Sequence, residues 1–206
     1  MRRQCCAWSR RWRSRTTSRP FTRITTFRTR SSRRSRPPSS LPSWPGLRVL
    51  GVDPGLIATG YGCLETGPAG VSVVDSGVIA TAPDAALEGR LDTIHAGVRA
   101  LLDKHAPSLL VVEDLYAEYR FPRTAILMGH ARGVIYLAAA QRGVAVLALA
   151  PAEVKRAIAA NGAASKGQVE RGVQMRLRLP CPPRPSHVAD ALSLALIGLS
   201  RAQGRL

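Results

Sequence analysis

The sequence predicts an α/β fold whose mixed five-stranded sheet is flanked by helices on both faces. Three observations support this prediction. Three apolar, β-branched runs follow one another directly after residue 46, two further runs of the same kind come later, and segments with helical periodicity separate these later runs. Strands that follow one another directly favour antiparallel pairing, whereas strands joined through a helix favour parallel pairing, so one sheet should contain both kinds.

The first three strands are expected between residues 47 and 80. The run LRVLGVD is rich in apolar and β-branched residues and ends at Pro54 and Gly55, a pair that turns the chain. Two further runs, each bounded by turn residues, complete an antiparallel meander at residues 58–65 (ATGYGCLE) and 71–80 (VSVVDSGVIA).

The rest of the chain alternates between helices and strands. SLLVVED predicts a buried strand at residues 108–114, VAVLALA predicts another at 144–150, a long helix lies between them at 123–141, and Pro151 opens a further helix at a favourable first position. With more helix after it, the order βββαβαβα is that of an RNase H-like architecture. The helix before the fourth strand is predicted by an apolar stripe at spacings of three and four, formed by Leu87, Leu91, Ile94, Val98, Leu101 and Leu102.

Residues 1–46 differ from the rest of the chain in composition. They hold 13 of the 30 basic residues, all of them arginine, and none of the 13 acidic ones, so residues 47–206 carry 30 − 13 = 17 basic against 13 acidic residues, a net charge of +4. Because the segment lacks apolar periodicity we expect it to be disordered, with the folded domain at residues 47–206. Three interpretations of it stay open: a start codon assigned upstream of the true one, a basic arm that binds phosphates, and a targeting segment.

Cysteine usage and hydropathy restrict the class of protein further. The four cysteines, Cys5, Cys6, Cys63 and Cys181, form no CxxC pair and no plausible disulfide framework, which favours a reducing cytoplasm. The sequence has no run of eighteen apolar residues, and its arginine-rich start lacks the apolar segment of a secretory signal. The net charge of +17 favours an acidic partner but does not by itself identify DNA.

Acidic residues end two of the predicted strands. Asp53 closes the first strand and Glu113 closes the fourth, with Asp114 on the opposite side of the pleat. Strand ends are where sites lie in sheets of this kind. If the two strands are neighbours, Asp53 and Glu113 converge, and their repulsion requires a proton or a divalent cation to compensate it.

A helix near the C-terminus carries a second pair of candidate ligands. In PSHVADALSLALIGL, His187 and Asp190 are three residues apart and therefore lie on one helical face, so docking of this helix on the sheet would bring four ligands together. Carboxylates favour Mg²⁺ or Mn²⁺, and imidazole tilts the preference toward Mn²⁺. Two ions about 3.5–4 Å apart would activate a water molecule and stabilise the leaving 3′-oxygen. The packed side of the helix is formed by Leu192, Ala195, Leu196 and Leu199.

Each candidate ligand also has an ordinary structural interpretation. Asp53 is a typical turn residue before Pro-Gly, and Glu113 could pair with an arginine such as Arg132. The His–Asp pair could stabilise a helix N-terminus capped by Ser186. The metal site is favoured because two strand-end acids and a helix pair occur together, in order, in one small domain.

The same segments resemble the successive motifs of the RuvC family of Holliday junction resolvases. The motifs are VLGVDPGLIATGYG, LLVVEDLY, GHARGVIYLAAAQRGVAV, APAEVKRAIAANGAASKGQV and HVADALSLALIG, and they cover roughly residues 47–200. The resemblance implies a crossover junction endodeoxyribonuclease that acts in homologous recombination and DNA repair. It implies a homodimer that binds a four-way DNA junction and nicks two opposing strands symmetrically, leaving 5′-phosphate and 3′-hydroxyl ends.

The resemblance also implies which residues form the catalytic metal site. Carried over onto this sequence, the family's four catalytic and metal-binding residues are Asp53, Glu113, His187 and Asp190, for Mg²⁺ or Mn²⁺ and two ions in each site. Many relatives have Asp in place of His187, although His also occurs there. The charge of the centre and its metal preference are therefore expected to depend on this position.

Five further residues are DNA-binding candidates. Tyr116 falls where relatives place an aromatic side chain that stacks on bases at the opened crossover, the alternative being an ordinary core or surface tyrosine. Lys155 and Lys166 match family lysines near the scissile phosphate, although a solvated helix face would also explain them. Arg120 and Arg123, in the segment AEYRFPRT, are further candidates for phosphate contacts.

The expected partners follow from one helix and from the resemblance. The helix at residues 124–141 mixes large apolar residues with Ala and Gly, which suits close packing against a second copy or burial within its own monomer. Its large apolar residues are Ile126, Leu127, Ile135, Tyr136 and Leu137. The resemblance further implies a RuvA–RuvB branch-migration complex as partner. The lack of a long apolar run predicts that no membrane is involved.

Three other classes of protein fit the sequence less well. An actin-like ATPase or sugar kinase also places Asp before Gly around a phosphate, but residues 47–206 leave no room for its two lobes. Another RNase H-like nuclease acting on RNA precursors or flaps would share the metal chemistry, but the tyrosine and the two lysines named above argue against it. A non-catalytic DNA-binding module would not need the intact acidic residues.

Overall fold

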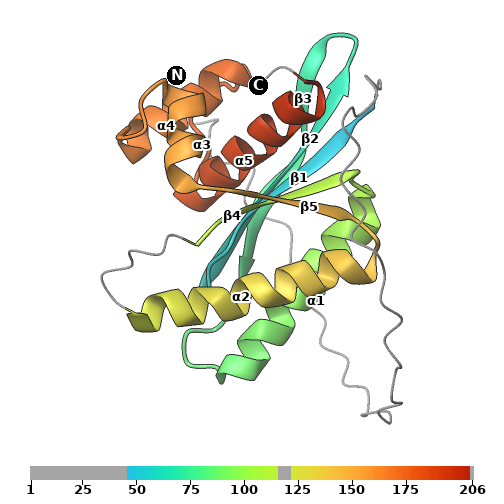
Figure 1. The fold of residues 1–206 in the computed structure, drawn as a ribbon, viewed down its shortest axis with the longest axis vertical. Helices are drawn as coiled ribbons and strands as arrows, with labels where there is room; N and C mark the ends of the chain where they lie inside the picture. Colours follow the sequence, from blue (N-terminus) through green and yellow to red (C-terminus); the bar gives the residue numbers. More distant parts are fainter. Residues whose placement is uncertain (1–45, 116–121, 205–206) are drawn as a thin grey trace. The chain divides into compact units, whose positions relative to one another are not determined.

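The computed structural model describes residues 46–115 and 122–204, and for residues 122 and 123 it describes the backbone alone (Figure 1). The predicted tail falls almost entirely outside the described residues and stays a prediction. The described residues belong to one compact unit, Leu41–Leu206. Its elements are β1 (Arg48–Asp53), β2 (Ala58–Gly67), β3 (Gly70–Ala80), α1 (Leu87–His105), β4 (Leu109–Glu113), α2 (Pro122–Gln141), β5 (Ala145–Leu149), α3 (Pro151–Ala159), α4 (Lys166–Arg176) and α5 (Ser186–Ala202).

Within the described residues, five strands form one mixed sheet in the order β3-β2-β1-β4-β5. The meander β1–β2–β3 is antiparallel, whereas β4 pairs parallel with β1 and β5 pairs parallel with β4. The prediction of a mixed five-stranded sheet is therefore confirmed. Because β1 is the central strand, its last residue has a neighbouring strand on either side.

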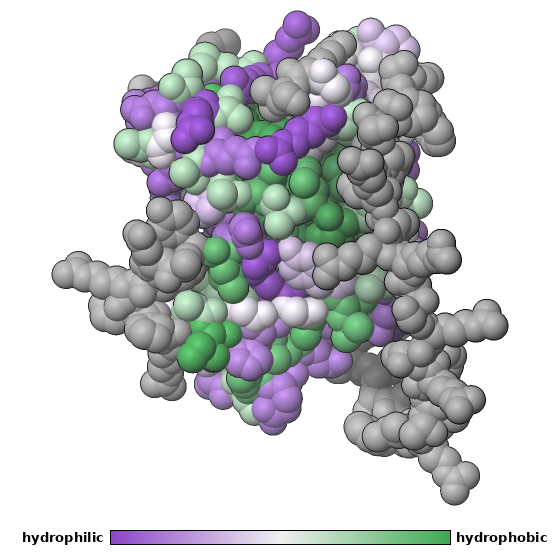
Figure 2. All heavy atoms as spheres, viewed as in Figure 1, coloured by the Kyte–Doolittle hydropathy of each residue, from purple (hydrophilic) through white to green (hydrophobic). Residues whose placement is uncertain are grey.

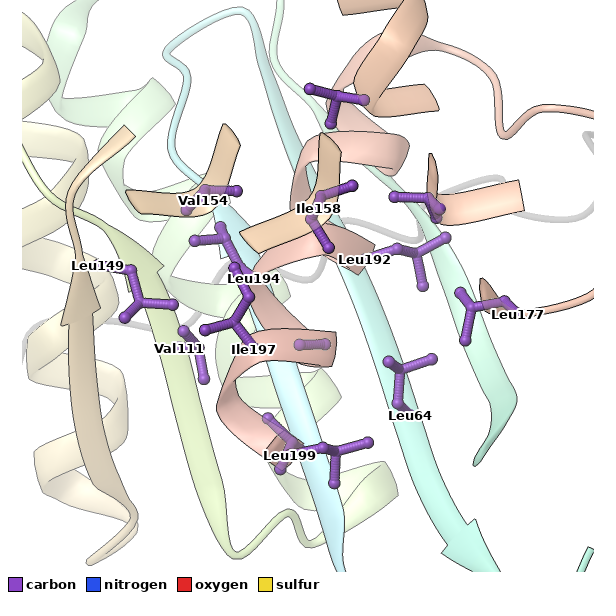
Figure 3. Close-up of a cluster of buried hydrophobic side chains, with 14 of the residues drawn as sticks. Leu64, Val111, Leu149, Val154, Ile158, Leu177, Leu192, Leu194, Ile197 and Leu199 are labelled. Carbon is purple, nitrogen blue, oxygen red and sulfur yellow. The ribbon is translucent and has the colours of Figure 1, made fainter. Parts of the chain in front are cut away.

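The alternation of side chains along β1 divides the core between two layers of helices. Val49 packs on one face of the sheet, in the cluster that α3, α4 and α5 complete, and this cluster includes the labelled residues of Figure 3. Leu50 and Val52 pack on the opposite face with α1 and α2. Figure 1 shows α5 lying along one face of the sheet, and α1 and α2 belong to the other layer. Since Asp53 shares its face with Val49, it belongs to the α5 side.

The helix boundaries follow the predicted patterns closely. In α1 the predicted stripe is buried at Ile94, Val98, Leu101 and Leu102, as expected for a helix packed on a sheet. The helix predicted from residue 123 begins one residue earlier, at Pro122, and Pro151 opens α3 as predicted. No helix within the described ranges is long and apolar enough to cross a membrane.

Candidate active site

Asp53 is the last residue of β1, and its buried carboxyl group is hydrogen-bonded to a residue of α5. Asp53 is only 7% exposed, and its Oδ2 is hydrogen-bonded to Nδ1 of His187 at a distance of 2.7 Å. The His187 side chain is 40% exposed, so one side of the pair is open to solvent. Pro54, directly after Asp53, is also buried. The interpretation of Asp53 as an ordinary turn residue does not account for its burial or for its hydrogen bond to α5.

Glycines in β1 and β2 allow α5 to lie directly on the sheet. A Cβ atom on Gly60, the cross-strand partner of Asp53, would lie 2.1 Å from the backbone oxygen of His187. A Cβ on Gly51 would lie 2.1 Å from the backbone oxygen of Ala191. Neither distance is compatible with a side chain, because the opposing atoms are helix backbone. The absence of side chains at these positions is what brings the first turn of α5 against the end of β1.

Glu113 occupies the matching place on the neighbouring parallel strand. Val52 of β1 pairs with Val112 of β4, so continuing the register by one residue sets Glu113 beside Asp53. Two residues earlier in β4, Val111 packs in the cluster on the α5 side, and Glu113 therefore points to the same face as Asp53. The condition under which Asp53 and Glu113 were expected to converge, that their strands are neighbours, is therefore met.

Asp114 and Arg132 form the ion pair that was considered for Glu113. Nη1 of Arg132 lies 3.0 Å from Oδ1 of Asp114, which points to the face covered by α2. The ordinary interpretation in which Arg132 pairs with Glu113 is therefore wrong, because the pleat turns the two adjacent acids to opposite faces. Glu113 remains on the side of Asp53.

His187 and Asp190 both lie in the first turns of α5. The helix begins at Ser186, and Pro185 occupies the N-cap position without a side-chain hydrogen bond. The idea that Ser186 caps this helix is therefore wrong, since Ser186 is already the first helical residue. Asp190 is half-buried, one turn after His187, so the two side chains project from one helical face.

Burial disfavours the charged form of all three carboxyl groups in this region. It raises the pKa of Asp53 to about 6, against the hydrogen bond from His187, and the charge of Asp190 adds to the rise. Burial likewise raises the pKa of Glu113 to about 7, with further contributions from the charges of Asp53 and Asp190. The pKa of Asp190 is also raised, mainly by its burial. A divalent cation bound between these buried carboxyl groups would stabilise their charged forms and offset their mutual repulsion.

Two lysines contribute positive charge to the same centre. Lys155 is half-buried in α3, and Lys166 is exposed at the start of α4. Their charges oppose the rise in pKa of Glu113 and Asp190, and the charge of Lys166 also acts on Asp53. Both lysines therefore lie within electrostatic range of the carboxylates, which a purely solvated helix face would not require.

A capping box fixes the helix end that carries Lys166. Ser165 precedes α4, and its backbone N donates to Oε1 of Gln168 at 2.8 Å while its Oγ accepts from the backbone N of Gln168 at 3.4 Å. This reciprocal pair satisfies two of the backbone groups that a helix start leaves open. It holds Lys166 at a defined position relative to the carboxylates.

Glu170 is a buried acid of this region that the sequence patterns did not single out. It lies one turn after Lys166 in α4, is 7% exposed, and its Oε2 lies 3.2 Å from Nη2 of Arg184. Its charge adds to the rise in the pKa of Asp190. The available sequence signal was a Lys–Glu spacing of four on one helix, which is also the pattern of an ordinary surface pair.

Three of the predicted DNA-binding residues lie wholly or partly outside the described residues. Tyr116 and Arg120 lie outside the described residues, as does the side chain of Arg123. Within the part of the chain that is described, no three acidic, histidine or cysteine side chains are arranged to enclose a metal ion as they stand. The carboxylate of Asp53 is bonded to His187 instead.

A mixed sheet with acidic residues at the ends of two central strands, and a third in the helix packed across them, defines an RNase H-like nuclease. A family model described as crossover junction endodeoxyribonuclease RuvC matches residues 49–198. The chain therefore belongs to the RuvC family.

Individual relatives agree with this assignment. The chain is 43% identical over 150 residues to the crossover junction endodeoxyribonuclease RuvC of Rhodopirellula baltica, covering 73% of this chain and 84% of that protein. It is 41% identical over 157 residues to the protein of the same name from Moorella thermoacetica, covering 76% and 93%. These shares show that the likeness extends over nearly the whole of the relatives.

Solved structures give the same result for the fold. The chain superposes on T. thermophilus RuvC in complex with Holliday junction substrate with a TM-score of 0.71 and 35% identity, covering 77% of this chain and 97% of that one. The yeast mitochondrial Holliday junction resolvase Ydc2 superposes with a TM-score of 0.56 over 80% of this chain and 83% of that one. At 16% identity, that second likeness shows the shared fold alone.

Proposed function

We propose that this chain resolves four-way DNA junctions by symmetric, metal-dependent nicking of two opposing strands in recombination and repair. The observation that carries the proposal is that Asp53 and Glu113 directly follow the paired residues Val52 and Val112 of adjacent parallel strands. His187 of α5 is hydrogen-bonded to Asp53. Membership of the RuvC family supports the reaction class, and a solved relative of 35% identity was determined with a Holliday junction substrate.

The donor set suits a hard divalent cation. Asp53, Glu113 and Asp190 supply oxygen ligands, and their raised pKa values mark a place where negative charge lacks compensation. We propose that these carboxylates and His187 hold two Mg²⁺ or Mn²⁺ ions. When bound, such ions supply a water molecule activated for attack and a counter-charge for the leaving 3′-oxygen.

His187 and the two lysines have different proposed roles. With Nδ1 of His187 directed at Asp53, Nε2 is the ring nitrogen that remains available to a ligand. Lys155 and Lys166 bring positive charge to the carboxylates, and we assign them contacts to the phosphates beside the scissile bond.

The residues that follow β4 are proposed to contact the crossover. Tyr116 follows Glu113 by three residues, a position that suits stacking on a base next to the cleaved strand. Arg120 and Arg123 are proposed to contact DNA phosphates. We also propose that a RuvA–RuvB branch-migration complex hands the junction to this chain, in line with the family resemblance.

An apolar groove on α2 supports a homodimer. Ile126 is 61% exposed and Leu137 is 50% exposed, although Ile135 of the same helix is fully buried. Hydrophobic side chains reach the surface on the face of the molecule that α2 crosses (Figure 2). A two-fold dimer formed on this surface would present two sites to a two-fold junction, which accounts for paired nicking. The groove is lined by Leu91, Ile126, Gly129, His130, Gly133, Val134 and Leu137.

The proposal is tested by cleavage of a synthetic four-way junction, with linear duplex and a flap beside it, in Mg²⁺ or Mn²⁺. The wild type should leave symmetric nicks on the junction that ligase can seal, and Asp53→Asn should abolish them while leaving junction binding intact. Asp103→Asn, which alters an exposed acid of α1, is the matched control and should cut normally. Preferential flap or RNA cleavage would favour a different nuclease, and binding without any cleavage would favour a non-catalytic module.

A further inference from the structure

The residue directly after Glu113 is held by three separate contacts. The backbone N of Asp114 donates to the backbone oxygen of Leu149 in β5 at 2.8 Å. Its Oδ1 accepts from the backbone N of Leu115 at 2.9 Å and also lies 3.0 Å from Nη1 of Arg132. The first contact extends the sheet by one residue, and the other two set the direction in which the chain leaves it. Because Asp114 directly follows Glu113 in the chain, these contacts also restrict the position of Glu113.

Arg132 is an unusually enclosed cation. Its side chain is 13% exposed, Nη2 donates to the hydroxyl of Tyr136 at 2.7 Å, and its guanidinium carbon lies 5.1 Å from the centroid of the same ring. Its Nε is buried and finds no hydrogen-bond partner among the described residues. A buried donor without a partner is costly, so this orientation is maintained by the contacts at the other end of the guanidinium.

The position of Arg132 on α2 is fixed by the core. Ala131, Ile135, Ala138 and Ala139 are fully buried against the sheet, whereas Arg132 and Tyr136, four residues apart, occupy one flank of the helix. Because the neighbouring face of α2 is packed in the core, the position of Arg132 is fixed, and its guanidinium can hold Asp114 in place. Lysine would supply the charge at this place but not the planar guanidinium, whose Nη1 contacts Asp114 while Nη2 donates to Tyr136.

We propose that Arg132 is a positioning residue for the reaction: by holding Asp114 from α2, it sets where Glu113 stands relative to Asp53. The inference rests on the proposed function, because it assigns Glu113 to the metal centre. It also assigns a second role to α2. The helix that carries the apolar groove is then linked, through the Arg132–Asp114 ion pair, to the end of β4. Asp114 itself is half-exposed, so the ion pair contributes little to overall stability, and its main effect is on the geometry of the site.

The test uses the full chain with Arg132→Lys, Asp114→Asn and the double variant. Mn²⁺ binding is measured by titration calorimetry without DNA, and junction cleavage is measured as a function of Mg²⁺ concentration. Each single variant should weaken Mn²⁺ binding and raise the Mg²⁺ concentration for half-maximal cleavage at least fivefold, with junction affinity within twofold of wild type. The double variant should be no worse than either single one, since both remove the same contact.

Arg142→Lys is the matched control, because Arg142 follows α2 and forms an exposed bidentate pair with Asp103, one of its two contacts measuring 2.8 Å. It should behave as wild type in every measurement. The proposal is overturned if metal binding and the Mg²⁺ curve of Arg132→Lys match those of the control, or if its loss of activity only follows a loss of folded protein. If the wild type cuts no junction but binds Mn²⁺ more tightly than the variants, the proposed function fails and the positioning role stands.

Discussion

Nδ1 of His187 lies 2.7 Å from Oδ2 of Asp53, so one hydrogen bond joins the first turn of α5 to the end of β1 across 134 positions of sequence. The bond connects two of the four residues proposed to bind metal. Because the helix lies directly on glycines of the sheet, the distance is set by backbone packing as well as by the side chains. Substitutions on either side of the contact should therefore alter both metal binding and stability.

Replacing His187 by Asp is expected to shift metal preference toward Mg²⁺. A carboxylate is a harder ligand than imidazole and adds negative charge, both of which suit Mg²⁺. The ratio of junction cleavage rates in Mg²⁺ and Mn²⁺ should therefore rise severalfold in His187→Asp. His95→Asp, which alters a histidine bonded to Gln141 instead, is the control. An unchanged ratio would remove His187 from the proposed ligand set.

Gly60→Ala should separate α5 from the end of β1. The added Cβ would lie 2.1 Å from the backbone oxygen of His187, so the helix must move, at a cost of roughly 1–3 kcal/mol or more. Both the free energy of unfolding and junction cleavage should fall. Gly89→Ala is the comparison, because nothing lies within 4 Å of its Cβ position in α1 and alanine favours helix there by about 0.5–1 kcal/mol. Chemical denaturation of both variants checks the contrast, and an unaltered stability for Gly60→Ala would contradict it.

The metal-free protein should gain stability when Glu113 is neutralised, and the gain should depend on pH. Folding raises the pKa of Glu113 from 4.5 to about 7, so the folded state favours the protonated form. The stability from this group is complete below pH 4.5 and is lost as the pH rises through about 7, by about 1.4 kcal/mol for each pH unit that separates the two pKa values. Glu113→Gln should therefore melt higher than wild type at pH 8 in the presence of a chelator.

The same comparison at pH 5 provides the control for Glu113→Gln. There the wild-type side chain is mostly protonated in the folded chain, so the difference in melting temperature should shrink. Saturating Mg²⁺ at pH 8 should reverse the order, because the cation stabilises only the ionised wild type. A difference that is equal at both pH values would show that the substitution acts through packing.

Leu137→Glu should prevent self-association. Leu137 is 50% exposed in the apolar groove on α2, and a charge buried there against a second copy would lack a partner. Sedimentation should give the monomer mass for this variant and the dimer mass for wild type, and nicking of the two strands should lose its pairing. Met175→Glu alters another exposed apolar residue, outside the groove, and should sediment like wild type. Equal masses for all three proteins would exclude the groove as the dimer surface.

Much of the candidate site could be predicted because its residues belong to sequence patterns that are recognisable over a few positions. Asp53 and Glu113 each end an apolar, β-branched run, and the His–Asp spacing of three defines a helical face, so short windows of sequence were sufficient to find them. Glu170 could not be found in this way. Its spacing from Lys166 is that of many solvated pairs, and its importance follows from its burial and its charge beside Asp190.

The sequence by itself determined the order of strands and helices and the identity of the acidic residues, because these depend on local periodicity and residue type. Its motifs also resemble those of the RuvC family. Only the tertiary structure decided that β1 lies between β2 and β4, that α5 rests on Gly51 and Gly60, and that Arg132 pairs with Asp114 and not with Glu113. These relationships depend on strand register and on close approach of backbones far apart in the chain. A short window of sequence contains no information on either, since both result from packing the whole domain at once.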